Sequence, residues 1–128
     1  MERDRRLEAA YAKRRAVLGD EYVDRATGDA DPASRAFQDF LTDTAWGVWT
    51  REGPLSTRDR SLIVLGMLAA MGRMEEFELH STAAPNAGVR DEEIDELLYQ
   101  IVAYCGAPAG VAARRILGRV RAARGTTR

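Results

Sequence analysis

The chain has one histidine and one cysteine in 128 residues, so the usual ligands of metal sites and the usual thiols of redox sites are missing. Cys105 alone excludes an intramolecular disulfide and a zinc cluster of cysteines, and His80 alone argues against a multi-histidine metal site. The sequence contains no P-loop, G-x-G-x-x-G, G-x-S-x-G or H-E-x-x-H motif. We therefore expect neither a metal nor a cofactor, and the low cysteine content fits a reducing cytoplasm.

Long apolar runs and an excess of charge of one sign are also absent. The longest apolar run, Leu62 to Met71, is about half of the roughly 20 residues that a membrane-spanning helix needs. The 19 basic and 20 acidic residues nearly cancel, which provides no strong field for nucleic acid or an anionic membrane. The charged N-terminus is followed by no apolar signal segment. We predict a cytoplasmic protein that binds neither nucleic acid nor membrane.

Every strongly patterned segment has helical periodicity, and no segment alternates apolar and polar residues as a half-buried strand does. The pattern predicts one all-α domain over residues 1–128 with about six helices. An N-terminal helix and a turn at 26–31 occupy residues 1–30, and residues 122–128 form a frayed tail. The helices are expected at about residues 3–18, 32–49, 56–71, 73–87, 91–105 and 107–120.

The periodicity also predicts which side chains face inward. Val102 is expected in the core with Ile94, Leu97, Leu98 and Ile101, and Cys105 is expected to be a small buried residue. For the second helix, the inward residues are expected to be Phe37, Leu41, Thr44, Ala45 and Val48.

One stripe carries the side chain best suited to proton transfer near neutral pH. His80 stands seven residues after Arg73 and four after Glu76, so all three are predicted on one helix face. A carboxylate one turn before an imidazole orients it and raises its pKa, as a general acid requires. The same spacing also fits an ordinary exposed Glu–His pair.

A second candidate segment is Trp46-Gly47-Val48-Trp49-Thr50-Arg51. The two indoles either wall an apolar pocket with a cationic entrance or are plain core residues. Arg58 and Arg60 stand in the first turn of the next helix, where the macrodipole disfavours cations. That position suggests a carboxylate partner: a ligand, Asp59 or an acid of a neighbouring subunit.

Five segments together resemble the carboxymuconolactone decarboxylase family, and the similarity runs from about Leu18 to Ile116. The resemblance implies an all-α, alkylhydroperoxidase-like helical bundle that assembles as a homotrimer or homohexamer. The segments are Leu18–Val23 (LGDEYV), Trp46–Arg51 (WGVWTR), Arg58–Leu62 (RDRSL), Glu78–His80 (ELH) and Tyr104–Ala109 (YCGAPA).

Alkylhydroperoxidase-type relatives carry a C-x-x-C motif with a histidine four residues after the second cysteine. His80 matches that histidine, but Arg73 and Glu76 occupy the two cysteine positions. A thiol peroxidase needs an attacking and a resolving thiol, so peroxidase chemistry is not expected. The resemblance is instead to the decarboxylase branch, whose carboxy-lyases convert 4-carboxymuconolactone to 3-oxoadipate enol-lactone in protocatechuate breakdown.

Resemblance and helix spacing together suggest roles for eight residues. His80 protonates the ring carbon and is oriented by Glu76. Departures from the family pattern at Glu52, Pro54, Pro85 and Arg90 leave open another small carboxylated lactone or natural-product intermediate as the substrate. A further alternative is a non-enzymatic oligomeric binding protein, in which the stripe with His80 serves only a subunit contact. The predicted substrate-binding residues are Trp46, Trp49, Arg51, Arg58, Arg60 and Arg73.

Overall fold

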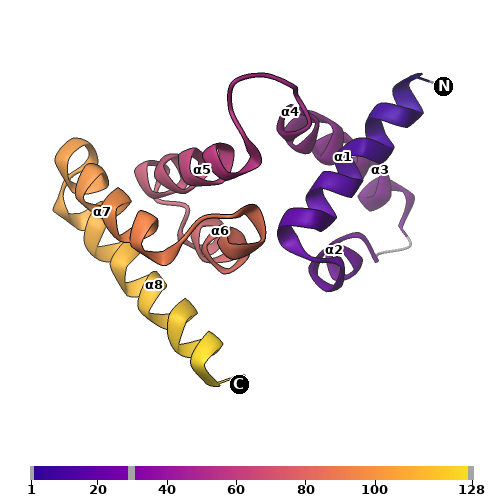
Figure 1. Ribbon diagram of the computed structural model, residues 1–128. Helices are drawn as coiled ribbons and strands as arrows, with labels where there is room; N and C mark the ends of the chain where they lie inside the picture. The colour runs from indigo at the N-terminus through magenta and orange to yellow at the C-terminus, as the bar shows by residue number, and fades with distance from the viewer. Residues whose placement is uncertain (1, 29–30, 127–128) are drawn as a thin grey trace. The chain divides into compact units, whose positions relative to one another are not determined.

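The computed structural model describes residues 2–28 and 31–126, and all regular secondary structure in these ranges is helical (Figure 1). This confirms the predicted all-α class. The chain divides into two compact units, Met1–Ser56 and Thr57–Arg128. None of the helices in the described ranges is long and apolar enough to cross a membrane. The single domain, the alkylhydroperoxidase-like arrangement and the oligomer stay predictions.

The unit Met1–Ser56 contains α1 (Glu2–Leu18), α2 (Asp20–Thr27), α3 (Pro32–Leu41), the π-helical segment η1 (Thr42–Trp46) and α4 (Gly47–Trp49). α1 ends before Gly19, whose φ of 92° lies in the left-handed region that glycine adopts without a steric penalty. The sequence pattern missed α2, because this short helix buries only Val23 and shows little periodicity. The predicted turn at 26–31 is wrong at its start, since α2 continues to Thr27, and Asp29 and Ala30 lie outside the described residues.

The predicted helix at 32–49 is helical throughout, but its predicted inward face is wrong. Phe37 and Val48 are 61% and 50% exposed, Thr44 and Ala45 are exposed, and only Leu41 is partly buried. Thr42, Trp46 and Trp49 are buried instead, in segments that pack against α1. A π-helical turn holds more residues than an α-helical turn, so η1 shifts the following side chains away from a regular 3.6-residue pattern.

The unit Thr57–Arg128 contains α5 (Thr57–Met71), α6 (Met74–Ala87), α7 (Asp91–Cys105) and α8 (Ala107–Thr126). α5 packs on α6 and α7 packs on α8, and both pairs share a core. Glycines with positive φ, Gly72 and Gly106, form the tight turns within the two pairs. The core residues include Leu65, Phe77, Ile94, Ile101, Ile116, Leu117 and Val120.

Three predictions for this unit are wrong. Val102 is 44% exposed, because it lines an open groove between α7 and α8 together with Val111, which is 55% exposed. Cys105, the last residue of α7, is exposed. The tail expected at 122–128 is helical as far as Thr126, and residues 127–128 lie outside the described ranges.

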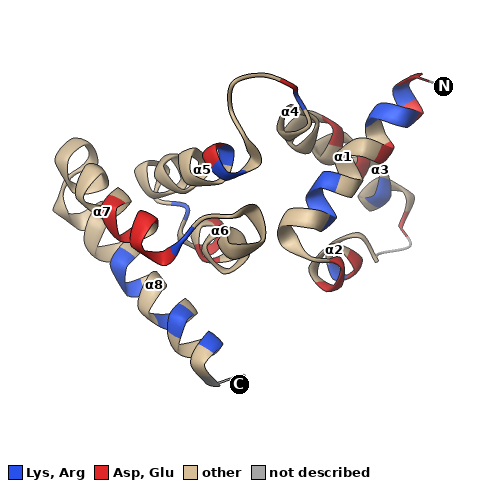
Figure 2. Ribbon diagram, viewed as in Figure 1, with Lys and Arg blue, Asp and Glu red and all other residues tan. Residues whose placement is uncertain are grey.

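Charge pairing reinforces the packing of α7 on α8. α7 begins with Asp91, Glu92 and Glu93, where the helix macrodipole favours acids. Figure 2 shows these acids beside arginines of α8, and the ion pairs Arg121–Asp95 and Arg124–Asp91 each measure 2.8 Å. These partly exposed pairs therefore fix the orientation of the two helices more than they add stability.

At Gly110, α8 comes close to the side chain of Val102 on α7. A Cβ atom at this position would overlap Cγ2 of Val102. Valine χ1 is restricted in a helix, so Val102 has little freedom to rotate away. Glycine is therefore needed at position 110 for the two helices to pack as they do.

We expect Gly110→Ala to lower the free energy of unfolding by about 1 kcal/mol, because the clash outweighs the gain in helix propensity. In a Val102→Ala background, the same change is expected to stabilise by about 1 kcal/mol, since the clash is gone. Gly118→Ala, on the same helix with no atom within 4 Å of its added Cβ, is the control and should be stabilising. Urea unfolding measures the free energy of unfolding of the two single variants at positions 110 and 102, of their combination and of Gly118→Ala. An equal effect of Gly110→Ala in the wild-type and Val102→Ala backgrounds would contradict the close approach.

Candidate active site

His80 lies on α6, one turn after Glu76, as the spacing predicts. Arg73 does not share this helical stripe. It is the N-cap residue that precedes α6, with φ −89° and ψ 75°, and it is exposed. The backbone of Arg73 leaves the helical conformation because the Gly72 turn separates α5 from α6. The structure therefore brings together Glu76 and His80, and the predicted three-residue stripe is wrong at Arg73.

Burial sets the protonation of His80. The partly buried imidazole loses hydration that would stabilise its charged form, which lowers its pKa below the ordinary value of 6.5. The negative charge of Glu76 raises the pKa, as the sequence predicts, but this effect is smaller than that of burial. The prediction of a raised pKa is therefore wrong for the net effect, although Glu76 acts in the predicted direction.

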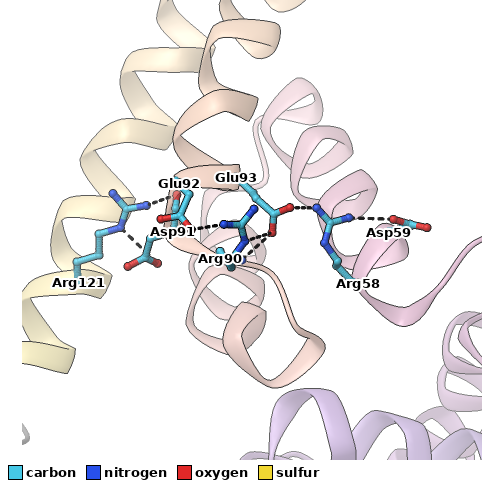
Figure 3. Close-up of polar contacts among 7 residues, drawn as sticks. All are labelled: Arg58, Asp59, Arg90, Asp91, Glu92, Glu93 and Arg121. Carbon is cyan, nitrogen blue, oxygen red and sulfur yellow. Dashed lines mark hydrogen bonds and ion pairs between the residues drawn. The ribbon is translucent and has the colours of Figure 1, made fainter.

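Arg58 at the start of α5 is held by acids of its own chain (Figure 3). Its guanidinium pairs with Asp59 at 3.0 Å and with Glu93 at the start of α7. The Glu93 side chain is only 14% exposed and also accepts a hydrogen bond from the backbone N–H of Arg90 at 2.9 Å. Arg58 therefore joins the starts of α5 and α7, and Glu93 is a partner that the sequence did not indicate.

The two indoles lie inside the unit Met1–Ser56. Trp46 is 5% exposed and Trp49 is 8% exposed, and their stacked rings are 4.8 Å apart at an interplanar angle of 27°. This burial matches the interpretation of both as core residues. Arg51 follows them in an exposed segment, whereas Arg60 is partly buried on α5 in the other unit. The convergence of the tryptophans and Arg51 on His80 stays a prediction.

The groove between α7 and α8 was not found from the sequence. It encloses about 920 Å³, its apolar wall includes Leu98 and Val111, and Arg114 and Arg115 lie at its edge. His80 does not line it. The sequence feature that could have indicated this groove is the spacing of Val111, Arg114 and Arg115, which puts them on one face of α8.

The positions equivalent to a C-x-x-C motif hold Arg73 and Glu76, and Cys105 is at the far end of α7. Within residues 2–28 and 31–126, no three His, Cys, Asp or Glu side chains are grouped closely enough to hold a metal ion. On the face of α6 that the sequence analysis singled out, the titratable side chains are those of Glu76 and His80.

The model of the carboxymuconolactone decarboxylase family matches residues 35–118, from α3 into α8. The chain belongs to this family. The nitrosuccinic acid decarboxylase of Metarhizium robertsii is 41% identical over 101 residues, which cover 78% of this chain and 70% of that protein. The 4-carboxymuconolactone decarboxylase of Acinetobacter baylyi is 35% identical over 121 residues, which cover 94% and 90%. The family resemblance predicted from the sequence is thus confirmed.

We expect the pKa of His80 to be below 6.5 in the folded protein, and Glu76→Gln to lower it further by removing the nearby negative charge. Folding stability should fall as the pH drops below 6.5, because the unfolded chain then binds the proton that folded His80 resists. The single histidine Cε1–H resonance, followed by NMR against pH, measures this pKa. Glu75→Gln, an exposed neighbour, is the control; an unshifted pKa in Glu76→Gln would contradict the coupling.

We expect Arg58→Gln to lower the free energy of unfolding by about 1–2 kcal/mol, because it leaves the largely buried Glu93 carboxylate without its guanidinium. Arg90→Gln removes an exposed guanidinium from the same carboxylate. This variant is the control and should lower the free energy of unfolding by less than Arg58→Gln does. Chemical denaturation measures both. An equal loss in the two variants would show that Arg58 does not anchor Glu93.

Proposed function

We propose that this protein is a cofactor-free decarboxylase that converts 4-carboxymuconolactone to 3-oxoadipate enol-lactone. The observation that carries the proposal is the match to a 4-carboxymuconolactone decarboxylase over 94% of this chain and 90% of that relative. His80 with Glu76 provides an ionisable pair on α6. The chain therefore contains a group able to handle the one proton that this reaction needs.

The substrate makes this reaction possible without a cofactor. Its leaving carboxylate is on a ring carbon that is conjugated through a double bond to the lactone carbonyl. When the bond to the carboxylate breaks, CO₂ leaves and the electron pair delocalises into a dienolate. A proton is then added to the ring carbon next to the lactone carbonyl, which leaves the double bond at the carbon that lost CO₂ and gives the enol-lactone. The protein must bind the carboxylates, exclude water, stabilise the dienolate oxygen and supply the proton.

His80 is the proposed proton donor, although burial lowers its pKa in the free protein. A bound substrate carboxylate close to the imidazole would favour its charged form and raise its pKa, opposing the effect of burial. Glu76 acts in the same direction. We therefore propose that His80 takes up its proton as the anionic substrate binds, with Glu76 as the positioning residue.

The remaining predicted site residues keep their proposed roles with one change. Arg51, Arg60 and Arg73 are proposed to bind substrate carboxylates, for which the planar guanidinium is well suited. Trp46 and Trp49 are proposed to form the apolar surroundings. Arg58 has a structural role, because Asp59 and Glu93 already hold it.

A second substrate is favoured by the 41% identity to a nitrosuccinic acid decarboxylase. Nitrosuccinic acid has two carboxyl groups, one of them on the carbon that bears the nitro group. Loss of CO₂ from that carbon leaves a nitronate, which is protonated at carbon as a dienolate is. The same proton donor would serve both compounds, so a small dicarboxylate with an electron-accepting group is the shared substrate class.

Self-association as a homotrimer or homohexamer is part of the proposal. Exposed apolar side chains support it, among them Phe40 at 65%, Met67 at 57% and Met71 at 62%. Met67 and Met71 are one turn apart on α5 and form one apolar stripe. Surfaces of this kind commonly mark sites of protein contact.

With 4-carboxymuconolactone, we expect the purified protein to release CO₂, and His80→Gln to lower kcat by about 10²–10⁴-fold with a smaller change in KM. Glu75→Gln is the control and should leave both constants unchanged. Release of CO₂ and loss of lactone absorbance measure turnover, with nitrosuccinate assayed in parallel. Turnover of nitrosuccinate alone would select the second substrate, and binding without turnover of either would indicate a non-enzymatic protein.

A further inference from the structure

The helix α3 turns its apolar side away from the rest of its own unit. Its apolar residues have the spacing i, i+3, i+4, i+7 and i+8, which in a surface helix normally faces the core. The polar side holds the helix instead, because Gln38 accepts a hydrogen bond from Arg14 of α1 and Asp39 accepts one from Tyr11 of α1. None of the ten residues of α3 is buried. The apolar residues are Ala33, Ala36, Phe37, Phe40 and Leu41.

Four of these residues form an outward surface, which we call the α3 apolar face: Ala33, Ala36, Phe37 and Phe40. All four are exposed, and the two phenylalanines are 61% and 65% exposed. Contiguous exposed apolar side chains commonly mark sites of protein contact. Anchors three, four and seven residues apart are what a helix inserts into the groove of a partner. We therefore expect a partner to cover the α3 apolar face.

The groove between α7 and α8 has the form that receives a helix. It encloses about 920 Å³ and lies along two packed helices, each of which contributes residues three or four apart. At Gly110 the side chain of Val102 fills the space that a Cβ atom would need, so the two helices approach closely there. The apolar part of its lining is Leu98, Tyr99, Val102, Ala103, Ala107, Gly110 and Val111.

The α3 apolar face and the groove match in length. With a rise of about 1.5 Å per residue, the face from Ala33 to Phe40 is about 10 Å long. The lining that α7 contributes, from Asp95 to Ala103, is about 12 Å long by the same measure. A third helix can therefore pack between α7 and α8 along the whole length of the face.

The charges at the two surfaces are opposite. Arg114 and Arg115 line the groove, are exposed and form no ion pair with any residue that the structure describes. Arg121 differs, because two acids of α7 hold it. Asp43 follows Phe40 by three residues and is exposed. The carboxylate after the α3 apolar face thus complements the guanidinium groups at the groove, and such pairs fix the orientation of a contact.

We propose that the α3 apolar face of one copy of this chain docks in the α7–α8 groove of a second copy, with Asp43 beside Arg114 and Arg115. Phe37 and Phe40 are the anchors, as buried aromatic side chains commonly are. The two surfaces differ, so the contact is heterologous and generates a ring when its rotation closes, as in a trimer. The inference rests on the self-association in the proposed function and names the surfaces that form it.

Light scattering of the full chain during dilution measures the self-association. We expect an oligomeric wild type, and we expect Phe37→Ser/Phe40→Ser to raise the Kd for self-association at least about 100-fold, about tenfold for each lost anchor. Arg35→Ser, on the polar side of α3, is the control and should keep the wild-type mass. Far-UV circular dichroism checks that each variant folds.

Reversing the charges tests the orientation of the docked helix. Asp43→Arg should lower the oligomer mass at a fixed concentration, and so should Arg114→Glu/Arg115→Glu, because each leaves like charges opposite one another. The three changes together restore opposite charges and should recover most of the mass. A loss caused only by a damaged fold would not be recovered by the combination.

Disulfide trapping decides the question even if the phenylalanine variants do not fold. In a Cys105→Ser background, a tagged chain with Phe40→Cys is co-expressed with an untagged chain with Val111→Cys, and the purified protein is oxidised with copper phenanthroline. We expect a disulfide-linked pair of one tagged and one untagged chain on a non-reducing gel. Arg35→Cys in place of Phe40→Cys is the control and should give no such pair.

The outcomes separate this docking from the rest of the proposed function. A monomeric wild type would overturn both the self-association and the docking. An oligomeric wild type whose mass Phe37→Ser/Phe40→Ser retains would overturn the docking alone. Disulfide-linked pairs of tagged chains only would also overturn it, since they would place two α3 helices against each other. None of these measurements depends on turnover, so the decarboxylase assay stands apart from them.

Discussion

The complete burial of Phe77 sets the rotation of α6 about its axis. Phe77, Ser81 and Ala84 form one buried stripe that faces the packed surfaces of α5 and α8. His80 is three residues after Phe77 and is therefore at the border of that stripe, partly buried, while Glu76 is exposed. The same hydrophobic contact that holds the helix thus determines how much water His80 retains, and through that its charge.

The arginines in the described residues differ in whether their guanidinium groups contact acidic or neutral side chains. Arg58, Arg119, Arg121 and Arg124 pair with acids of neighbouring helices and hold the unit Thr57–Arg128 together. Arg14 is the contrasting case, because it is buried among neutral partners. The sequence position of Arg58 suggested a carboxylate partner, and in the structure its partners are Asp59 and Glu93.

Most of the helices could be predicted from periodicity and from glycines at helix ends. α2 could not, because eight residues with one buried side chain give little periodic signal. The face of residues 32–49 could not either, because η1 interrupts the α-helical repeat and puts Trp46 and Trp49 inward. For the site, the Glu76–His80 pair followed from spacing. Arg73 fell outside the stripe because α6 begins one residue later.

The sequence by itself determined the helical class, the family, and the absence of a C-x-x-C motif before His80, since all three depend on residue identity and order. Only the tertiary structure decided the direction of the His80 pKa shift, the partners of Arg58 and the neutral partners of Arg14. These properties depend on burial and on side chains distant in sequence: Glu93 reaches Arg58 from 35 positions away, and Thr42 reaches Arg14 from 28. Local periodicity carries no information on such contacts, because it reports which face of a helix is apolar and not what packs against it.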